Sequence, residues 1–230
     1  MSAKLDDPAW KTAPPSSLFV APIPLVKENL AGNAEYNTTA RVLWDEKNIY
    51  VGFECRQPGP IFATLTEHDS KLYEEDIAEV FMDVGTDNSQ YTEFQASPNA
   101  VTGDYYHTWA PPPTYPAEKL DWDQMKNHTT DKEWNLKGFR AAASKLEEGG
   151  KQIGWTVEMA IPMEEILTKR GLPAALKAGQ VFRANFIRYV WLPGAKPEDK
   201  RIHNQLSWGA CGSGCPHVSP MAMKPVVCEK

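Results

Sequence analysis

Apolar side chains recur at every second position through much of this chain, and this alternation restricts the fold more than any other feature. It is clear in "ARVLWDEKNIYVGFEC", residues 40–55. A period of two is typical of a β-strand with one face in a core. The segment predicts a hairpin, with strands at 40–44 and 49–55 joined by a polar turn. The residues expected on the core face are Ile49, Val51, Phe53 and Cys55.

Similar alternation predicts strands in the rest of the chain. They are expected at 76–84, 90–97, 138–146, 154–162 and 180–192, and the strands at 138–146 and 154–162 should pair across "EEGGKQ". One short helix is expected in "PMEEILTKRGLP", with Pro162 in its first turn and Gly171 near its end. Many short strands and one helix favour an all-β, antiparallel β-sandwich.

Two segments do not follow the alternation. Residues 1–38 contain Pro14, Pro15, Pro22 and Pro24 and are expected to form an extended N-terminal wrap with a few edge pairings. Residues 103–135, rich in aromatics and proline, are expected to form a long functional loop. All 230 residues are expected to form one domain, since β-sandwiches often exceed about 200 residues.

Charge and composition narrow the possible partners and compartments. The net charge of −6 argues against nucleic acid or an anionic membrane as the main partner. No apolar run approaches the ~18 residues needed to span a bilayer. No secretory h-region is visible at the start, which fits either a cytoplasmic protein or one whose leader was replaced by a new Met. The oligomeric state is not evident.

The stretch "LYEEDIAEVFMD", residues 72–83, is unusually acidic for a segment that becomes a strand. Glu79 lies between apolar neighbours, so its carboxylate needs a donor, which an arginine, a metal or a ligand hydroxyl could supply. Glu74 and Glu75 are expected to be solvated, and Asp76 has no assigned role. A glycosidase pair of carboxylates is not supported by any other feature.

Asp83 lies at the end of this strand, and Asp87 and Asn88 follow it. Their oxygens could bind Ca²⁺, although the spacing is not that of an EF-hand loop. The favoured interpretation is a hairpin turn that uses Asp, Gly and Asn for their turn preferences.

The segment "WGACGSGCPHVSPMAM" contains Cys211, Cys215 and His217. The two cysteines could form a disulfide or remain thiols, and a Cys/Cys/His metal site lacks a fourth ligand. Cys55 and Cys228 are expected to be reduced core residues. His217, on a proline-stiffened loop, is expected to be a polar binding residue, with haem ligation as the alternative.

Three aromatic residues lack a periodic partner in the core: Tyr73, Trp109 and Tyr115. Aromatic rings stack on the apolar C–H faces of sugars, while carboxylates, amides and arginine bind the hydroxyls. The alternative is that these loop aromatics plug the open end of the sandwich.

Several segments together resemble carbohydrate-binding module family 9-like domains. They are "WDEKNIYVGFECRQP", "LYEEDIAEVFMDVGTDNSQYTEFQASPNAVTGD", "GWTVEMAIPMEEIL", "FRANFIRYVW" and "SWG…PHVSP", in the expected order after "LDDPAWKTAPP". The resemblance implies an immunoglobulin-like sandwich related to the haem- and sugar-binding domains grouped as DOMON-like. Two aromatic rings of sugar-binding members clamp a terminal sugar, and polar side chains bind its hydroxyls.

Transferred by position, the resemblance implies that Tyr73 is one of these aromatics and that His217 replaces the other. The family's strand Glu corresponds to Glu79, and the polar position of the next strand to Gln95. Arg188 resembles a recurrent subfamily feature and is expected to pair with Glu79 or meet the ligand. Calcium accompanies some members of the family.

The leading hypothesis is non-catalytic carbohydrate binding in a rim pocket, with no required cofactor. The pocket would be formed by Tyr73, Glu79, Gln95, Arg188 and His217, with Trp109 as a lid. Such a protein would be periplasmic or extracellular, with the cytoplasm as the alternative.

Two other functions stay open. The first is a b-type haem electron carrier that uses His217 with Met82, Met221 or Met223. The second is a carbohydrate-active enzyme with His217 and Glu79 as acid and base.

Overall fold

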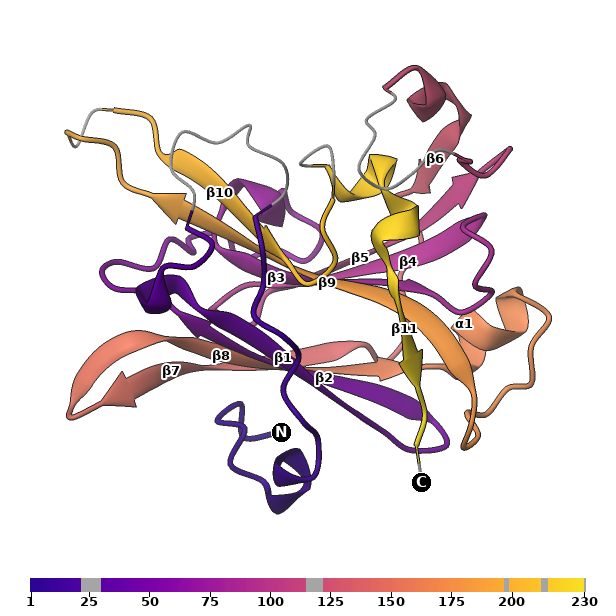
Figure 1. The fold of residues 1–230 in the computed structure, drawn as a ribbon, viewed down its shortest axis with the longest axis horizontal. Helices are drawn as coiled ribbons and strands as arrows, with labels where there is room; N and C mark the ends of the chain where they lie inside the picture. Colours follow the sequence, from indigo (N-terminus) through magenta and orange to yellow (C-terminus); the bar gives the residue numbers. More distant parts are fainter. Residues whose placement is uncertain (22–29, 115–121, 197–198, 212–214, 230) are drawn as a thin grey trace.

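The computed structural model describes residues 1–21, 30–114, 122–196, 199–211 and 215–229. Within them, two antiparallel sheets pack face to face (Figure 1). The predicted antiparallel β-sandwich is therefore confirmed. The smaller sheet has the order β1 (Thr38–Trp44), β2 (Asn48–Arg56), β8 (Lys151–Pro162), β7 (Arg140–Glu148). The larger sheet has the order β10 (Ile202–Ser207), β9 (Val181–Leu192), β3 (Ile77–Asp83), β4 (Gln90–Ala96), β5 (Thr102–Trp109), β6 (His128–Asp131), and β11 (Lys224–Val227) also pairs with β9.

The predicted hairpins are present. Val42 of β1 lies opposite Val51 of β2, and the Asp45 side chain accepts hydrogen bonds from two backbone N–H groups of the turn. Strands β7 and β8 pair across the predicted loop. The short helix α1 (Glu164–Lys169) is also present, but Pro162 is the last residue of β8 rather than part of the helix.

The main core lies between the two sheets. Phe53 of β2 packs edge-to-face against Phe186 of β9, with ring centroids 5.9 Å apart. The residues predicted for the core face of β2 are buried here, as are alternate residues of β8, because each strand turns one face toward the other sheet. The predicted core face of β2 is confirmed.

The segment 103–135 differs from the long loop that the sequence predicts. It contains most of β5, the 3-10 helix η4 (Trp122–Asn127) and β6. Strand β5 pairs with β4 on one edge and β6 on the other, and side chains on both of its faces are buried. Burial of both faces removes the contrast between polar and apolar positions by which an alternating strand is recognised.

The described part of residues 1–38 packs along the sandwich. Trp10 in the 3-10 helix η1 (Pro8–Lys11) is buried, and a second such helix, η2 (Ala34–Tyr36), precedes β1. Val20 forms an isolated bridge with Ser207 of β10, in agreement with the expected edge pairing. Pro22 and Pro24 lie outside the described residues.

The outer face of the larger sheet is also covered, and this arrangement positions the candidate site. All seven residues of β3 are buried. The C-terminal 3-10 helices η5 (Pro216–Val218) and η6 (Pro220–Ala222) lie over the outer face, as the yellow turns in Figure 1 show. A second apolar cluster fills the space beneath them, formed by Phe81, Tyr91, Trp109, Ile187 and Met223.

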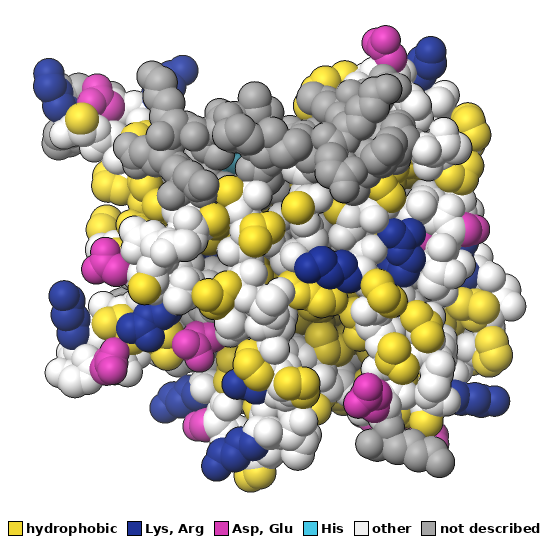
Figure 2. All heavy atoms as spheres, viewed as in Figure 1, with side chains coloured by type: hydrophobic (Ala, Val, Ile, Leu, Met, Phe, Trp, Pro, Cys, Tyr) yellow, Lys and Arg dark blue, Asp and Glu magenta, His cyan; other side chains and the backbone are white. Residues whose placement is uncertain are grey.

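Charges of both signs are interspersed on the face that Figure 2 presents. Lys and Arg side chains alternate there with Asp and Glu and with apolar groups. The described residues of this face form no field of positive charge of the kind that attracts nucleic acid.

Candidate functional site

A pocket of about 530 Å³ lies on the outer face of the larger sheet. Its size is that of an ordinary small-ligand site. The pocket is therefore built on a face of the sheet. The prediction placed it at the rim of the sandwich. Its lining residues are Asp69, Lys71, Tyr73, Glu93, Gln95, Tyr105, His107, Thr130, Lys132, Glu133, Asn135 and His217.

Tyr73 and His217 line this same pocket although they are far apart in the chain. Tyr73 lies in the 3-10 helix η3 (Leu72–Glu74), and 44% of its surface is exposed. The indole N–H of Trp191 donates to the backbone oxygen of Tyr73 (3.1 Å), which holds η3 against β9. The His217 side chain is 29% exposed. Both rings are thus accessible to a ligand.

Polar groups of β4 form part of the pocket lining. The Gln95 amide donates to Oε1 of Glu93 (2.5 Å) and to Oε1 of Glu79 (3.0 Å). Glu79 is 1% exposed and is not a lining residue, so it supports Gln95 from within the protein. Glu79 Oε2 and Gln95 Oε1 are buried and lack hydrogen-bond partners among the described residues.

The two carboxyl groups that share Gln95 affect each other's titration. Burial raises the pKa of Glu79 well above its ordinary value, and the nearby charge of Glu93 raises it further. Burial also raises the pKa of Glu93, whereas a positive charge on His217 would lower it. The pair therefore retains a proton more readily than exposed carboxylates do.

Three histidines gather beside the pocket. The Tyr91 hydroxyl is 2.9 Å from Nε2 of His128 and 2.9 Å from Nδ1 of His217. His107 Nε2 is 2.9 Å from Glu93 Oε2, and His217 Nε2 is 3.7 Å from the same oxygen. Burial lowers the pKa of His107 to about 3 and the pKa values of His128 and His217 to about 4. The three imidazoles are neutral at pH 7.

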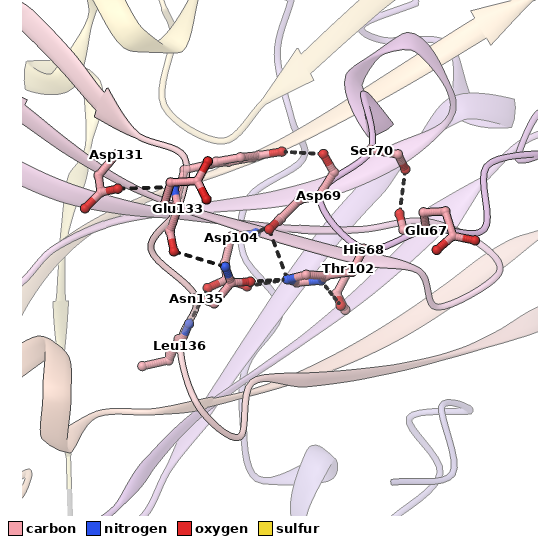
Figure 3. Close-up of polar contacts among 11 residues, drawn as sticks. Glu67, His68, Asp69, Ser70, Thr102, Asp104, Asp131, Glu133, Asn135 and Leu136 are labelled. Atoms are coloured by element: carbon pink, nitrogen blue, oxygen red, sulfur yellow. Dashed lines mark hydrogen bonds and ion pairs between the residues drawn. The ribbon is translucent and has the colours of Figure 1, made fainter.

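A second polar group supports the edge of the pocket (Figure 3). His68 Nε2 lies 2.6 Å from Asn135 Oδ1, 3.2 Å from Asp69 Oδ2 and 3.4 Å from Asp104 Oδ1. The backbone N–H of Leu136 donates to Asp104 Oδ2 (2.6 Å). These contacts fix the two lining residues Asp69 and Asn135. Burial raises the pKa of Asp104 to about 6.

The structure contradicts the predicted pairing of Arg188 with Glu79. Arg188 lies opposite Ala78 in the ladder, so its side chain enters the main core, whereas Glu79 faces outward. The guanidinium donates to Thr38 Oγ1 (2.8 Å), to the backbone oxygen of Arg56 (2.8 Å) and to Gln57 Oε1 (2.7 Å). Arg188 is fully buried and is not a pocket residue.

Trp109 does not form the predicted lid. Its side chain is 2% exposed and packs in the outer apolar cluster with Phe81 and Tyr91. This arrangement agrees with the alternative in which the aromatic residue fills space. Tyr115 lies outside the described residues.

The remaining acidic residues have mainly structural contacts. Glu75, expected to be solvated, is 3% exposed and accepts hydrogen bonds from the backbone N–H groups of Thr64 (2.7 Å) and Leu65 (3.1 Å). That expectation is wrong because the preceding loop folds back onto its carboxylate. Glu74 is exposed as expected. Asp76, which had no assigned role, accepts from the backbone N–H of Trp191 (2.7 Å).

The predicted turn after β3 is confirmed. Asp83 accepts hydrogen bonds from the backbone N–H groups of Gly85, Thr86 and Asn88, and Asp87 forms an ion pair with Arg170 (2.8 Å). Among the described residues, the groups with metal-ligand spacing are the two histidine-containing ones, and neither includes Asp83 or Asp87. Calcium binding by these two residues stays a prediction.

The cysteines are reduced, and one of the methionines considered for haem ligation lies away from the pocket. Cys55, Cys211, Cys215 and Cys228 are thiols, and Cys55 and Cys228 lie in the main core as expected. Met82 also lies in that core, on the face of β3 opposite the pocket, so it cannot act as an axial partner of His217.

In the alternative of a carbohydrate-active enzyme, His217 and Glu79 act as acid and base, but the structure does not bring these two side chains together. The carboxylate near His217 is that of Glu93, whereas Glu79 lies deeper.

Several lining residues were not predicted as site residues. Glu93 shares the polar face of its strand with Gln95, and this alternation was a usable signal. Tyr105 and His107 also alternate along β5, but their segment was interpreted as a loop. Asp69 and Lys71 are brought in by loop geometry, for which the sequence carries no periodic signal.

A family model described as "Carbohydrate family 9 binding domain-like" matches residues 2–211. The chain belongs to this family. Membership confirms the resemblance found in the sequence and supports non-catalytic carbohydrate binding. A search of curated proteins found no match.

Two solved structures show the same fold. A putative carbohydrate-binding protein from Bacteroides uniformis has a TM-score of 0.60 and 13% identity, over 94% of this chain and 87% of that one. A carbohydrate binding module family 9 from Caldicellulosiruptor kristjanssonii, in complex with cellotriose, has a TM-score of 0.54 and 15% identity, over 99% of this chain and 87% of that one. Among the described residues of the family 9 chain, no helix is both long and apolar enough to cross a membrane.

Proposed function

We propose that the chain holds one sugar unit in the pocket lined by Tyr73 and His217, without acting on it chemically. The observation that carries this proposal is the meeting of two accessible rings, from distant parts of a family 9 chain, above the polar side chains of Glu93 and Gln95. Sugar rings require this combination of apolar faces and directed hydrogen-bond partners.

Each group has a distinct task in this proposal. The Tyr73 ring stacks on the C–H face of the sugar, and the His217 imidazole contacts it from another element. Glu93 accepts hydrogen bonds from sugar hydroxyls, while Lys71 donates one. Each bond contributes about 0.5–1.5 kcal/mol net, so micromolar affinity, about 8 kcal/mol, needs several bonds in addition to stacking.

The first ligand class to test is short β-linked gluco-oligosaccharides. The module from Caldicellulosiruptor kristjanssonii was solved with cellotriose, and the present pocket has room for a sugar unit. We further propose a periplasmic or extracellular setting, where such glycans occur. A glycan array with and without added Ca²⁺ would identify the preferred sugar and test the calcium prediction.

Isothermal titration of the Tyr73→Ala variant with the best array ligand tests the pocket. Loss of the stacking ring should weaken binding at least about 5-fold, since a stacked aromatic is worth about 1 kcal/mol or more. The control is Tyr50→Ala, which removes a tyrosine from β2 in the other sheet. Unchanged affinity in Tyr73→Ala, or an equal loss in both variants, would reject this pocket.

A further inference from the structure

Three imidazoles from three separate elements converge beside the sugar pocket. His107 lies on β5, His128 begins β6 and His217 lies in η5. One ring nitrogen from each lies within 4.8 Å of those of the other two. The ring centroids are 4.9 Å apart for His107 and His217, 5.2 Å for His107 and His128, and 5.5 Å for His128 and His217.

The backbone fixes this convergence. His128 lies opposite Trp109 in the β5–β6 ladder, so His107 and His128 are diagonal neighbours on the outer face of the sheet. His217 follows Pro216, which is buried at the start of η5. Four-coordinate Zn²⁺ binds imidazole nitrogen at about 2.0–2.1 Å, which places ligand nitrogens about 3.3 Å apart. Side-chain rotations that move each ligand nitrogen by about 1 Å would reduce the spacing of at most 4.8 Å to this value.

The groups around the imidazoles fit metal ligation. Glu93 lies 2.9 Å from His107 Nε2, and the Thr130 hydroxyl lies 3.1 Å from His107 Nδ1. Because both His107 nitrogens have a partner, a metal bound to one of them would displace that contact. The other contact would then orient the ring, as the carboxylate or hydroxyl partner of a metal-binding histidine usually does.

We infer that His107, His128 and His217 form a binding site for a divalent transition metal of the Zn²⁺ class. His107, His217 and Glu93 line the sugar pocket, so a fourth coordination position would face the pocket or be taken by the Glu93 carboxylate. Three imidazoles favour such a metal over Ca²⁺ or Mg²⁺, which prefer oxygen ligands. The inference goes beyond the proposed sugar binding.

The competing explanation is a purely structural stack of aromatic and imidazole rings. Tyr91 stacks on His107, with centroids 4.5 Å apart, and its hydroxyl bridges the other two histidines. Such a stack would fill the space beneath η5 without needing an ion. The two explanations differ in what happens when zinc is added.

The test uses the full chain, free of any affinity tag and dialysed against a chelator. ZnCl₂ titration should show one site per chain with a dissociation constant of about 1 μM or tighter. CoCl₂ should give the intense visible absorption of four-coordinate Co²⁺ bound to nitrogen and oxygen ligands. If the wild type releases or absorbs no heat on zinc addition and shows no visible absorption with cobalt, the inference is overturned in favour of the structural stack.

Variants locate the site. His128→Ala should weaken zinc at least about 100-fold, since a direct ligand is lost. The control His203→Ala removes a histidine that packs on Tyr189 and Trp191 outside the cluster, and it should bind zinc as the wild type does. If His128→Ala does not fold, His217→Gln serves instead. Equal zinc affinity in the ligand variant and the wild type would overturn the inference, as would an equal loss in the control.

A sugar titration of the metal-free wild type separates this result from the proposed function. Sugar binding without zinc binding would overturn only the metal site. Zinc binding without sugar binding would overturn only the sugar pocket.

Discussion

The buried carboxylates of this protein differ in the hydrogen-bond donors that they receive. Glu75 and Asp76 accept backbone N–H groups and fix the loops that carry them. Glu79 receives one bond from Gln95, and its other oxygen has no partner among the described residues. Buried carboxylates that lack full satisfaction are costly, and here they support the floor of the pocket.

Asp104 should make stability depend on pH between about 4 and 6. Its pKa is raised to about 6 in the folded protein, so the folded state holds this proton more tightly than the unfolded chain. The resulting stabilisation is present below pH 4 and is lost as the pH rises through 6. It amounts to at most about 3 kcal/mol at 1.36 kcal/mol per pKa unit.

Urea unfolding of the wild type and Asp104→Asn at pH 4, 5, 6 and 7 measures this contribution. The free energy of unfolding of the wild type, minus that of the variant, should fall as the pH rises. Groups not coupled to Asp104 cancel in this difference. Parallel pH profiles for the two proteins would show that Asp104 titrates normally.

At the scale of an element, the β3–β4 turn depends on Asp83. Thr86 and Asn88 adopt φ of +61°, a left-handed conformation that costs non-glycine residues about 1 kcal/mol or more. The Asp83 carboxylate accepts three backbone N–H groups of this turn and compensates for that cost. Asp83→Ala should lower the free energy of unfolding by about 2 kcal/mol.

Asp87→Ala is the matched control for this turn. Asp87 is 54% exposed, although its ion-pair partner Arg170 is largely buried, and loss of this half-exposed pair should cost about 1 kcal/mol. In denaturant unfolding, the free energies of unfolding of the wild type and of Asp87→Ala should both be higher than that of Asp83→Ala. Equal losses in the two variants would mean that the Asp83 carboxylate has no special role in the turn.

At the scale of the whole molecule, Arg188 links the two sheets. It extends from β9 of the larger sheet to Thr38 of β1 and to the backbone of Arg56 in β2. Arg188→Ala would leave these buried acceptors without their donor and create a cavity, so unfolding should require about 3 kcal/mol less. Sugar affinity at 15 °C, where the variant is folded, should equal that of the wild type.

Calorimetry of Arg188→Ala at that temperature separates the two roles of the arginine. A large loss of sugar affinity with an unchanged free energy of unfolding would show that Arg188 takes part in sugar binding. Circular dichroism of the same sample verifies that the variant is folded.

The alternation of apolar and polar residues by itself determined the β-sandwich, the β1–β2 and β7–β8 hairpins and the core face of β2. These strands have one face in the core, and a one-sided strand shows its period in the sequence. The resemblance to family 9 domains placed Tyr73, Gln95 and His217 at one site, and all three line the pocket.

Only the tertiary structure decided the rest of the pocket. Strand β5 is covered on both faces, so its period is hidden, and with it the contributions of Tyr105 and His107. Arg188 and Glu79 were placed together by resemblance, but the β3–β9 register puts them on opposite faces of the sheet. The convergence of His107, His128 and His217 depends on strand register and on how the C-terminal turns cover the sheet. Contacts between residues distant in the chain arise from packing, and local periodicity does not contain them.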